Sequence, residues 1–230
     1  MPTLKSILLR AGLVAAGLAA WFGTQAMIGA RHAATGALPI ETDRVLELLS
    51  PVHGYLSSHD AACNGLLIIS SAGIDMLALF LLARAIFGPT IRPFLGLLIL
   101  FGLRQVFQAI CILPPPEGMI WRYPGFPSLL VTYGVSNDLF FSGHTALAVF
   151  GAVELARLHR RLIPLGVVIA VFEIGTVLAL RAHWTMDAYA GAVTALLIAF
   201  LAGHISGPVD RLLAKISTDQ KPAALQGNRQ

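Results

Sequence analysis

The sequence predicts an all-α, polytopic membrane protein, a bundle of six transmembrane helices with both termini in the cytoplasm. Of its 230 residues, 56% are hydrophobic and only 12% are charged, whereas soluble chains carry about 25% charged residues. So few charged side chains cannot cover a globule with polar groups, so lipid must surround the chain. The same composition excludes a disordered chain, a coiled coil and a disulfide-framed secreted module.

Six apolar segments are candidates for helices that cross the hydrocarbon core, which takes about 20 residues, and the fourth of them is short. Gly88-Pro89, the triple proline that begins at Pro114 and Gly207-Pro208 end the second, third and sixth of them. A short basic turn separates the fourth from the fifth, so these two should form an antiparallel hairpin. The expected spans are 7–28, 64–87, 94–113, 143–158, 162–180 and 186–205.

The first span has two interpretations. Lys5 and Arg10 beside apolar residues fit a cleaved signal peptide, but the apolar stretch exceeds the usual length of about 7–15 residues, so we favour an uncleaved helix. The chain shows no internal repeat. Residues 1–217 should therefore form one domain, followed by a polar, mobile tail over residues 218–230.

Basic residues predict the orientation, because cytoplasmic loops are enriched in Lys and Arg. With the N-terminus inside, eleven basic residues fall in cytoplasmic segments and four outside, and Arg104 lies within the third span. The loops 29–63 and 114–142 and the turn 181–185 should therefore face away from the cytoplasm. Basic residues recur at the ends of apolar runs rather than in one cluster, which argues against nucleic acid as a partner.

The first candidate site segment is Ser142-Gly143-His144-Thr145, at the start of the fourth span. Ser142 fits an N-cap, and Gly143 allows a ligand to approach the backbone closely. The amides of the first helical turn then face outward and favour an anion. His144 would lie beside that anion.

The second candidate segment is His183-Trp184-Thr185-Met186-Asp187. The i, i+4 spacing predicts that His183 and Asp187 share one helical face. A carboxylate beside one ring nitrogen fixes the imidazole tautomer and leaves the other nitrogen free to attack. Arg104, an intramembrane cation, is a further candidate, and Arg181 would supply a second positive charge.

Each of these signals alone has an ordinary structural interpretation. A histidine near a helix end is commonly a polar end residue, and a lone H-x-x-x-D arises by chance. An acid on a neighbouring span is an alternative partner for Arg104, with Asp75, Glu154 and Glu173 as candidates. The gathering of two histidines, a carboxylate and two arginines at the outward ends of spans favours a catalytic site.

The two cysteines, Cys63 and Cys111, are too far apart in the sequence for a C-x-x-C pair or a zinc motif. Both fall near outward ends of spans, so a disulfide between them stays open, although we expect free thiols.

The candidate segments resemble known motifs. Phe141-Ser142-Gly143-His144-Thr145 and His183-x-Thr185-x-Asp187 resemble the second and third signature motifs of the type 2 phosphatidic acid phosphatase superfamily. Arg104, followed after eight residues by Leu113-Pro114-x-Pro116, is similar to a pattern of the sphingomyelin synthases and the plant phosphatidylcholine:diacylglycerol cholinephosphotransferases. Residues 181–187 resemble the Arg-Gly-His-Tyr-Thr-Ile-Asp stretch of the latter.

This sequence departs from the phosphatase motifs at two points, which bear on whether it resembles the phosphatases or the transferases more. The phosphatases carry a first motif with Lys and Arg-Pro that this sequence lacks, which favours the transferases. They also carry an arginine six residues before the third-motif histidine, where this chain has Val177.

The resemblance implies that His183 attacks a lipid phosphorus to give a phosphohistidine, that Asp187 orients it, and that His144 acts as acid and then base. Arg104, Arg181 and the segment Ser142-Gly143-Thr145 would hold the phosphoryl oxygens. It implies no cofactor and no metal. The expected partners are a phospholipid donor, a lipid alcohol acceptor or water, and membrane lipids, with the site on the non-cytoplasmic face.

The acceptor distinguishes the candidate functions. A lipid hydroxyl, of diacylglycerol or a ceramide-like lipid, gives a headgroup transferase, whereas water gives a lipid-phosphate phosphatase. The long outward loop, with aromatic residues including Trp121 and Tyr133, is a candidate lid that excludes water. A non-catalytic transporter or scaffold is the alternative from another class, and it leaves His144, His183 and Asp187 without an explanation.

Overall fold

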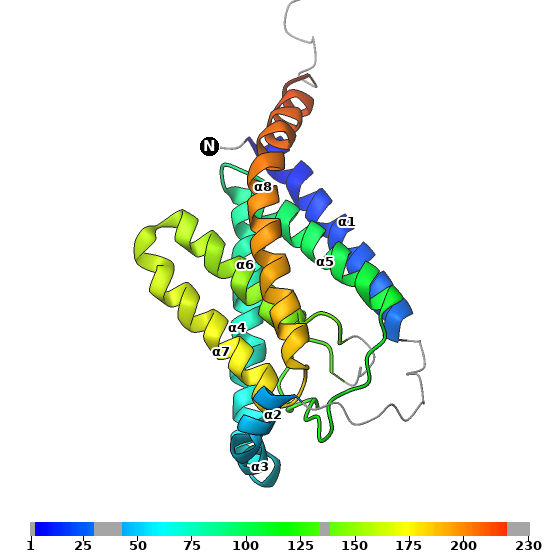
Figure 1. Cartoon of the computed structure of the whole chain (residues 1–230). Coiled ribbons are helices and arrows are strands. Elements are labelled where there is room, and N and C mark those ends of the chain that lie inside the picture. Colours follow the sequence, from blue (N-terminus) through cyan, green and yellow to red (C-terminus); the bar gives the residue numbers. More distant parts are fainter. Residues whose placement is uncertain (1–2, 30–42, 134–138, 220–230) are drawn as a thin grey trace, which may run out of the picture.

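A computed structural model describes residues 3–29, 43–133 and 139–219, and the regular structure within these ranges is helical. The long helices lie together as a bundle, with two short helices at one end (Figure 1). The long helices are α1 (Leu4–Gly29), α4 (Asp60–Phe87), α5 (Arg92–Ile110), α6 (Gly143–Leu158), α7 (Ile163–Ala179) and α8 (Thr185–Asp219). The short ones are α2 (Arg44–Leu48), α3 (Ser50–Ser58) and the 3-10 turn η1 (Arg160–Leu162).

Within the described ranges, five helical segments are long and apolar enough to cross a membrane: Leu4–Met27, Asp60–Phe87, Arg92–Ile110, Arg160–Ala179 and Thr185–Ser217. They correspond to five of the six expected spans. The remaining expected span, 143–158, forms α6, which has 16 residues and is shorter than the length that a span ordinarily needs. The all-helical fold is confirmed, whereas a sixth crossing and the orientation of the termini stay predictions.

Helix α6 occupies the centre of the bundle and packs against α4, α5, α7 and α8. Its ring of Phe150 is fully buried and lies against Gly96 of α5, where an added Cβ would come within 2.1 Å of the ring. The predicted hairpin is present, because η1 alone joins α6 to α7. In that turn, the His159 Nδ1 atom accepts a hydrogen bond from the Arg161 amide at 3.0 Å.

The expected end of the last span at Gly207-Pro208 is wrong, because α8 continues through Pro208 to Asp219. Proline within a helix costs about 3 kcal/mol, so the continuation needs tertiary support. Asp210 supplies it by accepting hydrogen bonds from the Thr90 hydroxyl at 2.5 Å and the Ile91 amide at 2.9 Å. Leu213 is buried in an apolar cluster that includes Val14 and Phe94. Of the expected tail, residues 218–219 belong to α8 and residues 220–230 lie outside the described ranges.

The expected loop 29–63 contains regular structure. Asp43 is the N-cap of α2, and Pro51 stands in the first turn of α3, as helix-start signals do. Residues 30–42 lie outside the described part of the chain.

The two ends of the bundle differ in their elements, and each takes its name from the predicted orientation. The outer end holds α2, α3 and the first turn of α8, and the inner end holds the α4–α5 turn, the α6–α7 turn and the N-terminus of α1 (Figure 1).

Candidate active site

The first turn of α6 is built as the sequence predicts. The Ser142 hydroxyl accepts a hydrogen bond from the Thr145 amide at 3.3 Å, so Ser142 is the N-cap. A Cβ on Gly143 would lie 3.3 Å from Arg104 Nε, which shows how closely the guanidinium approaches this turn. The first amides of a helix have no acceptor within it, so this turn offers donors next to a cation.

Packing of α8 on α6 brings the two candidate segments together. The Ser142 amide donates a hydrogen bond to the Asp187 carbonyl oxygen at 3.1 Å. A few residues along α8, a Cβ on Gly191 would lie 2.7 Å from the Ser142 carbonyl oxygen. Only a glycine allows this approach. The two segments are therefore joined directly through their backbones.

His183 and Asp187 lie beside each other, with 3.8 Å between His183 Nδ1 and Asp187 Oδ2. The predicted reason is wrong, because α8 begins at Thr185 and His183 lies in the turn before it. Asp187 faces back over that turn, where its Oδ2 accepts a hydrogen bond from the Trp184 amide at 3.0 Å. Both side chains are buried, and within the described part of the chain neither His183 Nδ1 nor Asp187 Oδ1 has a hydrogen-bond partner.

Arg104 reaches this group from the middle of the bundle. Its side chain on α5 is buried at 7% exposure, and its Nε donates a hydrogen bond to the Phe141 carbonyl oxygen at 2.9 Å. The contact places the guanidinium against the segment that leads into α6. An arginine so placed suits the oxygens of a phosphate.

The acids considered as partners of Arg104 have other bonds. Asp75 accepts from the Leu129 and Leu130 amides at 2.6 and 2.9 Å, which ties the loop after α5 to α4. Glu173 accepts from the Ser70 hydroxyl at 2.6 Å. Glu154 pairs with Arg92 at the inner end.

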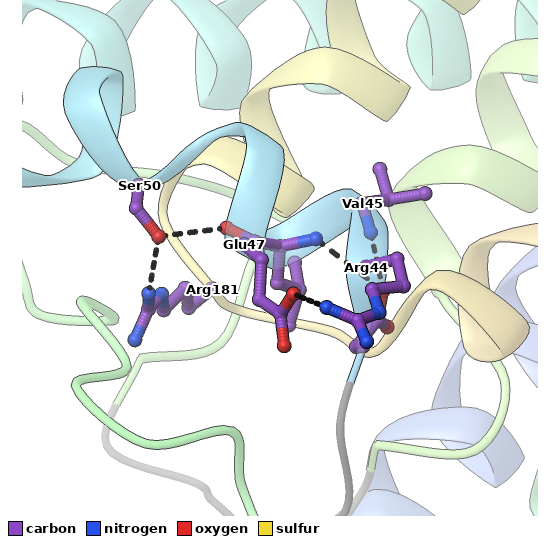
Figure 2. A network of polar contacts seen from close by, with 7 residues as sticks. Arg44, Val45, Glu47, Ser50 and Arg181 are labelled. Atoms are coloured by element: carbon purple, nitrogen blue, oxygen red, sulfur yellow. Dashed lines mark hydrogen bonds and ion pairs between the residues drawn. The ribbon is translucent and has the colours of Figure 1, made fainter.

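Arg181 lies elsewhere than expected. Its NH1 donates to the Glu117 carbonyl oxygen at 2.8 Å and its NH2 to the Ser50 hydroxyl at 3.0 Å. Figure 2 shows the guanidinium directed toward Ser50 at the start of α3. The structure therefore ties Arg181 to α3 and to the loop after α5, and it is absent from the described residues that line the cavity below.

A cavity of about 440 Å³ begins at these residues, within the range of ligand sites. Arg104, Gly143, His144 and His183 line its polar end. Apolar residues of α1 and α5 line a further part of the cavity, the apolar arm. The arm is lined by residues that include Gly17, Leu18, Trp21, Phe94, Leu98, Phe101 and Gly102. Asp187, Ser142 and Thr145 are fully buried behind the polar end.

The loop after α5 covers the polar end. Trp121 lines the cavity, and its ring meets His144 edge-on, with centroids 5.1 Å apart. The indole nitrogen of Trp121 donates to the Thr132 carbonyl oxygen at 2.9 Å, and that of Trp184 donates to the Pro114 carbonyl oxygen at 2.9 Å. The latter bond joins the Leu-Pro-x-Pro segment to the third motif. Part of the expected lid, residues 134–138, lies outside the described ranges.

Sequence reasoning missed Asp43. Its Oδ2 accepts from the Thr185 amide at 2.7 Å and its Oδ1 from the Thr185 hydroxyl at 2.8 Å. Partial burial raises the pKa of the Asp43 carboxyl, but these bonds and those from the α2 amides outweigh it, and the pKa is lowered from its ordinary value. An aspartate ahead of an apolar run, Val45 to Leu49, was the available signal.

Within the described ranges, no group of three or more His, Cys, Asp or Glu side chains is arranged to hold a metal ion. Cys63 and Cys111 are free thiols, as expected.

Fold and site together define an integral membrane protein with a histidine- and arginine-lined cavity that continues among apolar helices. Residues 42–204, more than half of the chain, match the AtPDCT1/2 family, the phosphatidylcholine:diacylglycerol cholinephosphotransferases, and the chain belongs to that family. Its members are enzymes of lipid headgroup transfer. No curated protein and no solved structure matches the chain.

The match confirms the resemblance to the transferase branch. It covers every candidate site residue and begins directly before Asp43. Membership in the wider phosphatase superfamily and the roles of the individual residues stay predictions.

Proposed function

We propose that this protein transfers the phosphocholine headgroup from phosphatidylcholine to diacylglycerol through a phosphohistidine on His183. Membership of the family supports the substrates. The observation that carries the mechanism is that His144 and His183, from separate segments of the chain, line one cavity with Arg104.

In the first half-reaction, His183 attacks the phosphorus of phosphatidylcholine. Nδ1 faces Asp187 at 3.8 Å, so Nε2 is the attacking atom, and the carboxylate stabilises the positive charge that develops on the ring. A distance of this size in a site without substrate shortens when the site closes on it. As the N–P bond forms, the bond from phosphorus to the diacylglycerol oxygen breaks, and protonated His144 gives that oxygen its proton.

In the second half-reaction, neutral His144 takes the proton from the hydroxyl of the incoming diacylglycerol. The oxygen attacks phosphorus, the N–P bond to His183 breaks, and phosphatidylcholine is released with both histidines restored. His144 Nε2 is buried, has no hydrogen-bond partner in the residues that the structure describes, and belongs to a residue that lines the cavity, as expected for a group whose partner is the substrate.

Positive charge for the phosphoryl oxygens comes from two sources. Arg104 lies against Gly143, and the first-turn amides of α6 add the positive end of the helix dipole. Donors that are fixed before the substrate arrives stabilise the charge that spreads over phosphorus oxygens in the transition state. Arg181 has an indirect role in this proposal. It does not contact the phosphate but holds the turn that carries His183 against α3.

The apolar arm of the cavity suits an acyl chain. It is lined by residues of α1 and α5, both of which are long and apolar enough to span a membrane. A lipid whose phosphate lies at Arg104 would extend its tail along this arm. Trp121, over His144, covers the polar end and favours transfer over hydrolysis by limiting access of water.

The test uses purified protein in lipid nanodiscs with choline-labelled phosphatidylcholine and a diacylglycerol of different acyl composition. Label in a new phosphatidylcholine with the acceptor's acyl chains supports the proposal. Labelled phosphocholine in water indicates a hydrolase, and no turnover of labelled lipid contradicts both functions.

The matched variants are His183→Ala and His204→Ala. His183→Ala should lower transfer by about 10³-fold or more, because it removes the nucleophile. His204 lies in α8, which follows the turn that carries His183, and its exposed ring bonds the Phe200 carbonyl oxygen of its own helix, so its variant should transfer at the wild-type rate. Full activity of His183→Ala would rule out the phosphohistidine.

A further inference from the structure

The outer clamp, residues 43–58, comprises Asp43 and the helices α2 and α3, and it packs beneath the turn that leads into α8. Leu46 and Leu56 are buried in one apolar cluster with Leu178 and Leu180. The His53 Nδ1 atom donates a hydrogen bond to the carbonyl oxygen at the end of α7 at 3.0 Å. The clamp therefore contacts the end of α7, the segment that comes before His183 in the chain.

Asp43 of the clamp contacts the start of α8, which follows His183 in the chain. Its carboxylate receives both the amide and the hydroxyl of Thr185, at 2.7 and 2.8 Å. The same carboxylate accepts from the Val45 and Leu46 amides at 3.0 and 3.3 Å. One side chain thus caps the N-termini of two helices, α2 and α8, that are far apart in the sequence.

The cap bears directly on the reacting residues. Thr185 lies two residues after His183 and two before Asp187, and the intervening Trp184 amide is bonded to the Asp187 carboxylate at 3.0 Å. We propose that Asp43 is a positioning residue, which holds Thr185 so that His183 and Asp187 keep the geometry that phosphocholine transfer needs. The inference rests on the proposed function.

A carboxylate suits this role for two physical reasons. Negative charge at the N-terminus of a helix is favourable, and Asp43 stands at two such termini. Four hydrogen bonds to one carboxylate also fix its position, so the start of α8 is tied to α2 rather than free to fray. The 3.8 Å separation of His183 and Asp187 depends on the path of exactly this turn, and a misplacement of about 1 Å costs about 100-fold in rate.

The first experiment measures the contact itself and needs no substrate. Hydrogen–deuterium exchange of the peptide that covers Thr185 is compared in wild-type protein, Asp43→Ala and Asp43→Asn. Loss of the cap should accelerate exchange of the Thr185 amide by about fivefold or more in Asp43→Ala, and less in Asp43→Asn, which keeps one acceptor oxygen. Unchanged exchange in both variants would overturn the inference.

The second experiment separates positioning from binding. In the transfer assay, kcat of Asp43→Ala should fall by about 10- to 100-fold while KM for phosphatidylcholine stays within about twofold. Thr185→Val should also lower kcat. In the double variant Asp43→Ala/Thr185→Val, the fall in kcat should be smaller than the product of the two single falls, because both changes remove the same contact. Thr185→Ser keeps the hydroxyl and should retain most of the activity.

The matched control is Glu47→Gln. Glu47 is an exposed carboxylate on α2 that pairs with Arg44, as Figure 2 shows, and the described structure gives it no bond to the turn before α8. Its variant should match the wild type in exchange and in kcat. An equal loss in Glu47→Gln, or a wild-type kcat in Asp43→Ala, would overturn the positioning role. Wild-type protein that turns over no phosphatidylcholine would instead overturn the proposed function, and the exchange data would still test the Asp43–Thr185 contact.

Discussion

The two ends of the bundle both contain buried arginines but use them differently. At the inner end, the Arg92 guanidinium pairs with Glu154 and donates to the Ala199 carbonyl oxygen at 2.7 Å, and Arg10 donates to the Gly88 carbonyl oxygen at 2.6 Å. At the outer end, Arg104 lines a cavity.

The neighbours of these arginines differ in the same way. Around the outer cavity, His144 Nε2, His183 Nδ1 and Asp187 Oδ1 are buried and have no hydrogen-bond partner among the described residues. Among the described residues of the inner end, the Nε atoms of Arg10 and Arg92 are also buried without a hydrogen-bond partner, but Arg10 donates through NH1 and Arg92 through NH1 and NH2. Buried polar atoms are ordinarily satisfied, and those of His144 and His183 belong to residues that line a cavity, so we interpret the inner end as structural and the outer end as a candidate ligand site.

The largest expected effect compares one substitution at both ends. Asp187→Asn should lower transfer by about 10³- to 10⁴-fold, because an amide cannot stabilise the charged imidazole of His183. Asp210→Asn, which weakens the bonds to Thr90 and Ile91, should keep transfer within about twofold. It should lower the free energy of unfolding by about 1 kcal/mol. Transfer assays and thermal melts of the two proteins check this, and equal losses of activity would remove the distinction between the ends.

The next largest effect is expected when the ion pair between Arg92 and Glu154 at the inner end is broken. Arg92→Met leaves the buried Glu154 charge without its partner and should lower the free energy of unfolding by about 3–5 kcal/mol. The double variant Arg92→Met/Glu154→Met should recover most of that loss, because no unpaired charge remains. Denaturation in a fixed detergent measures both. A single variant as stable as the wild type would show that the pair is not a structural device.

A smaller effect is expected in the apolar arm of the cavity. Gly102 lines the cavity and a Cβ there meets nothing within 4 Å, so Gly102→Leu should place its side chain in the arm. Transfer from long-chain phosphatidylcholine should fall about 10-fold, and transfer from a short-chain analogue should fall less. Gly12→Leu, an equally open position that is not among the cavity residues, is the control. Equal rates for both chain lengths would place the acyl chain elsewhere.

The smallest effect is the pH dependence of the Asp43 cap. The pKa of Asp43 is lowered in the folded protein, so its contribution is complete above the ordinary carboxyl pKa of 3.8 and is lost as the pH falls through the lower folded value. The difference in Thr185 amide exchange between wild type and Asp43→Asn should therefore be constant from pH 8 to about 5 and shrink below 3.8. A difference that vanishes near neutral pH would contradict a charged cap.

Several elements could be predicted from local sequence alone. The apolar segments predicted the helices because burial in lipid demands long uninterrupted runs, and Ser142 predicted the start of α6 because an N-cap needs only its own first turn. The basic turn between α6 and α7 predicted their hairpin for a similar reason.

Other elements depended on distant contacts. α2 and α3 have 5 and 9 residues, too few for an isolated helix to persist, and they form because Leu46 and Leu56 pack on the end of α7. Pro208 failed to end α8 because Asp210 and Leu213 hold the following turns to the inner end. Arg181 was expected to contact the phosphate because it lies two residues before His183 in the sequence. In the structure, its guanidinium instead donates hydrogen bonds to Ser50 and to the Glu117 carbonyl oxygen.

By itself, the sequence determined that this chain folds as apolar helices in lipid, and it pointed to His144, His183, Asp187 and Arg104 as the residues with chemistry. Only the tertiary structure decided that the histidines share a cavity with Arg104, that Arg181 binds away from it, and that Asp43 caps the helix that carries Asp187. The physical reason is that local rules reach one helical turn along the chain. The approach of α8 to α6 at Gly191 is instead set by the packing of the whole bundle.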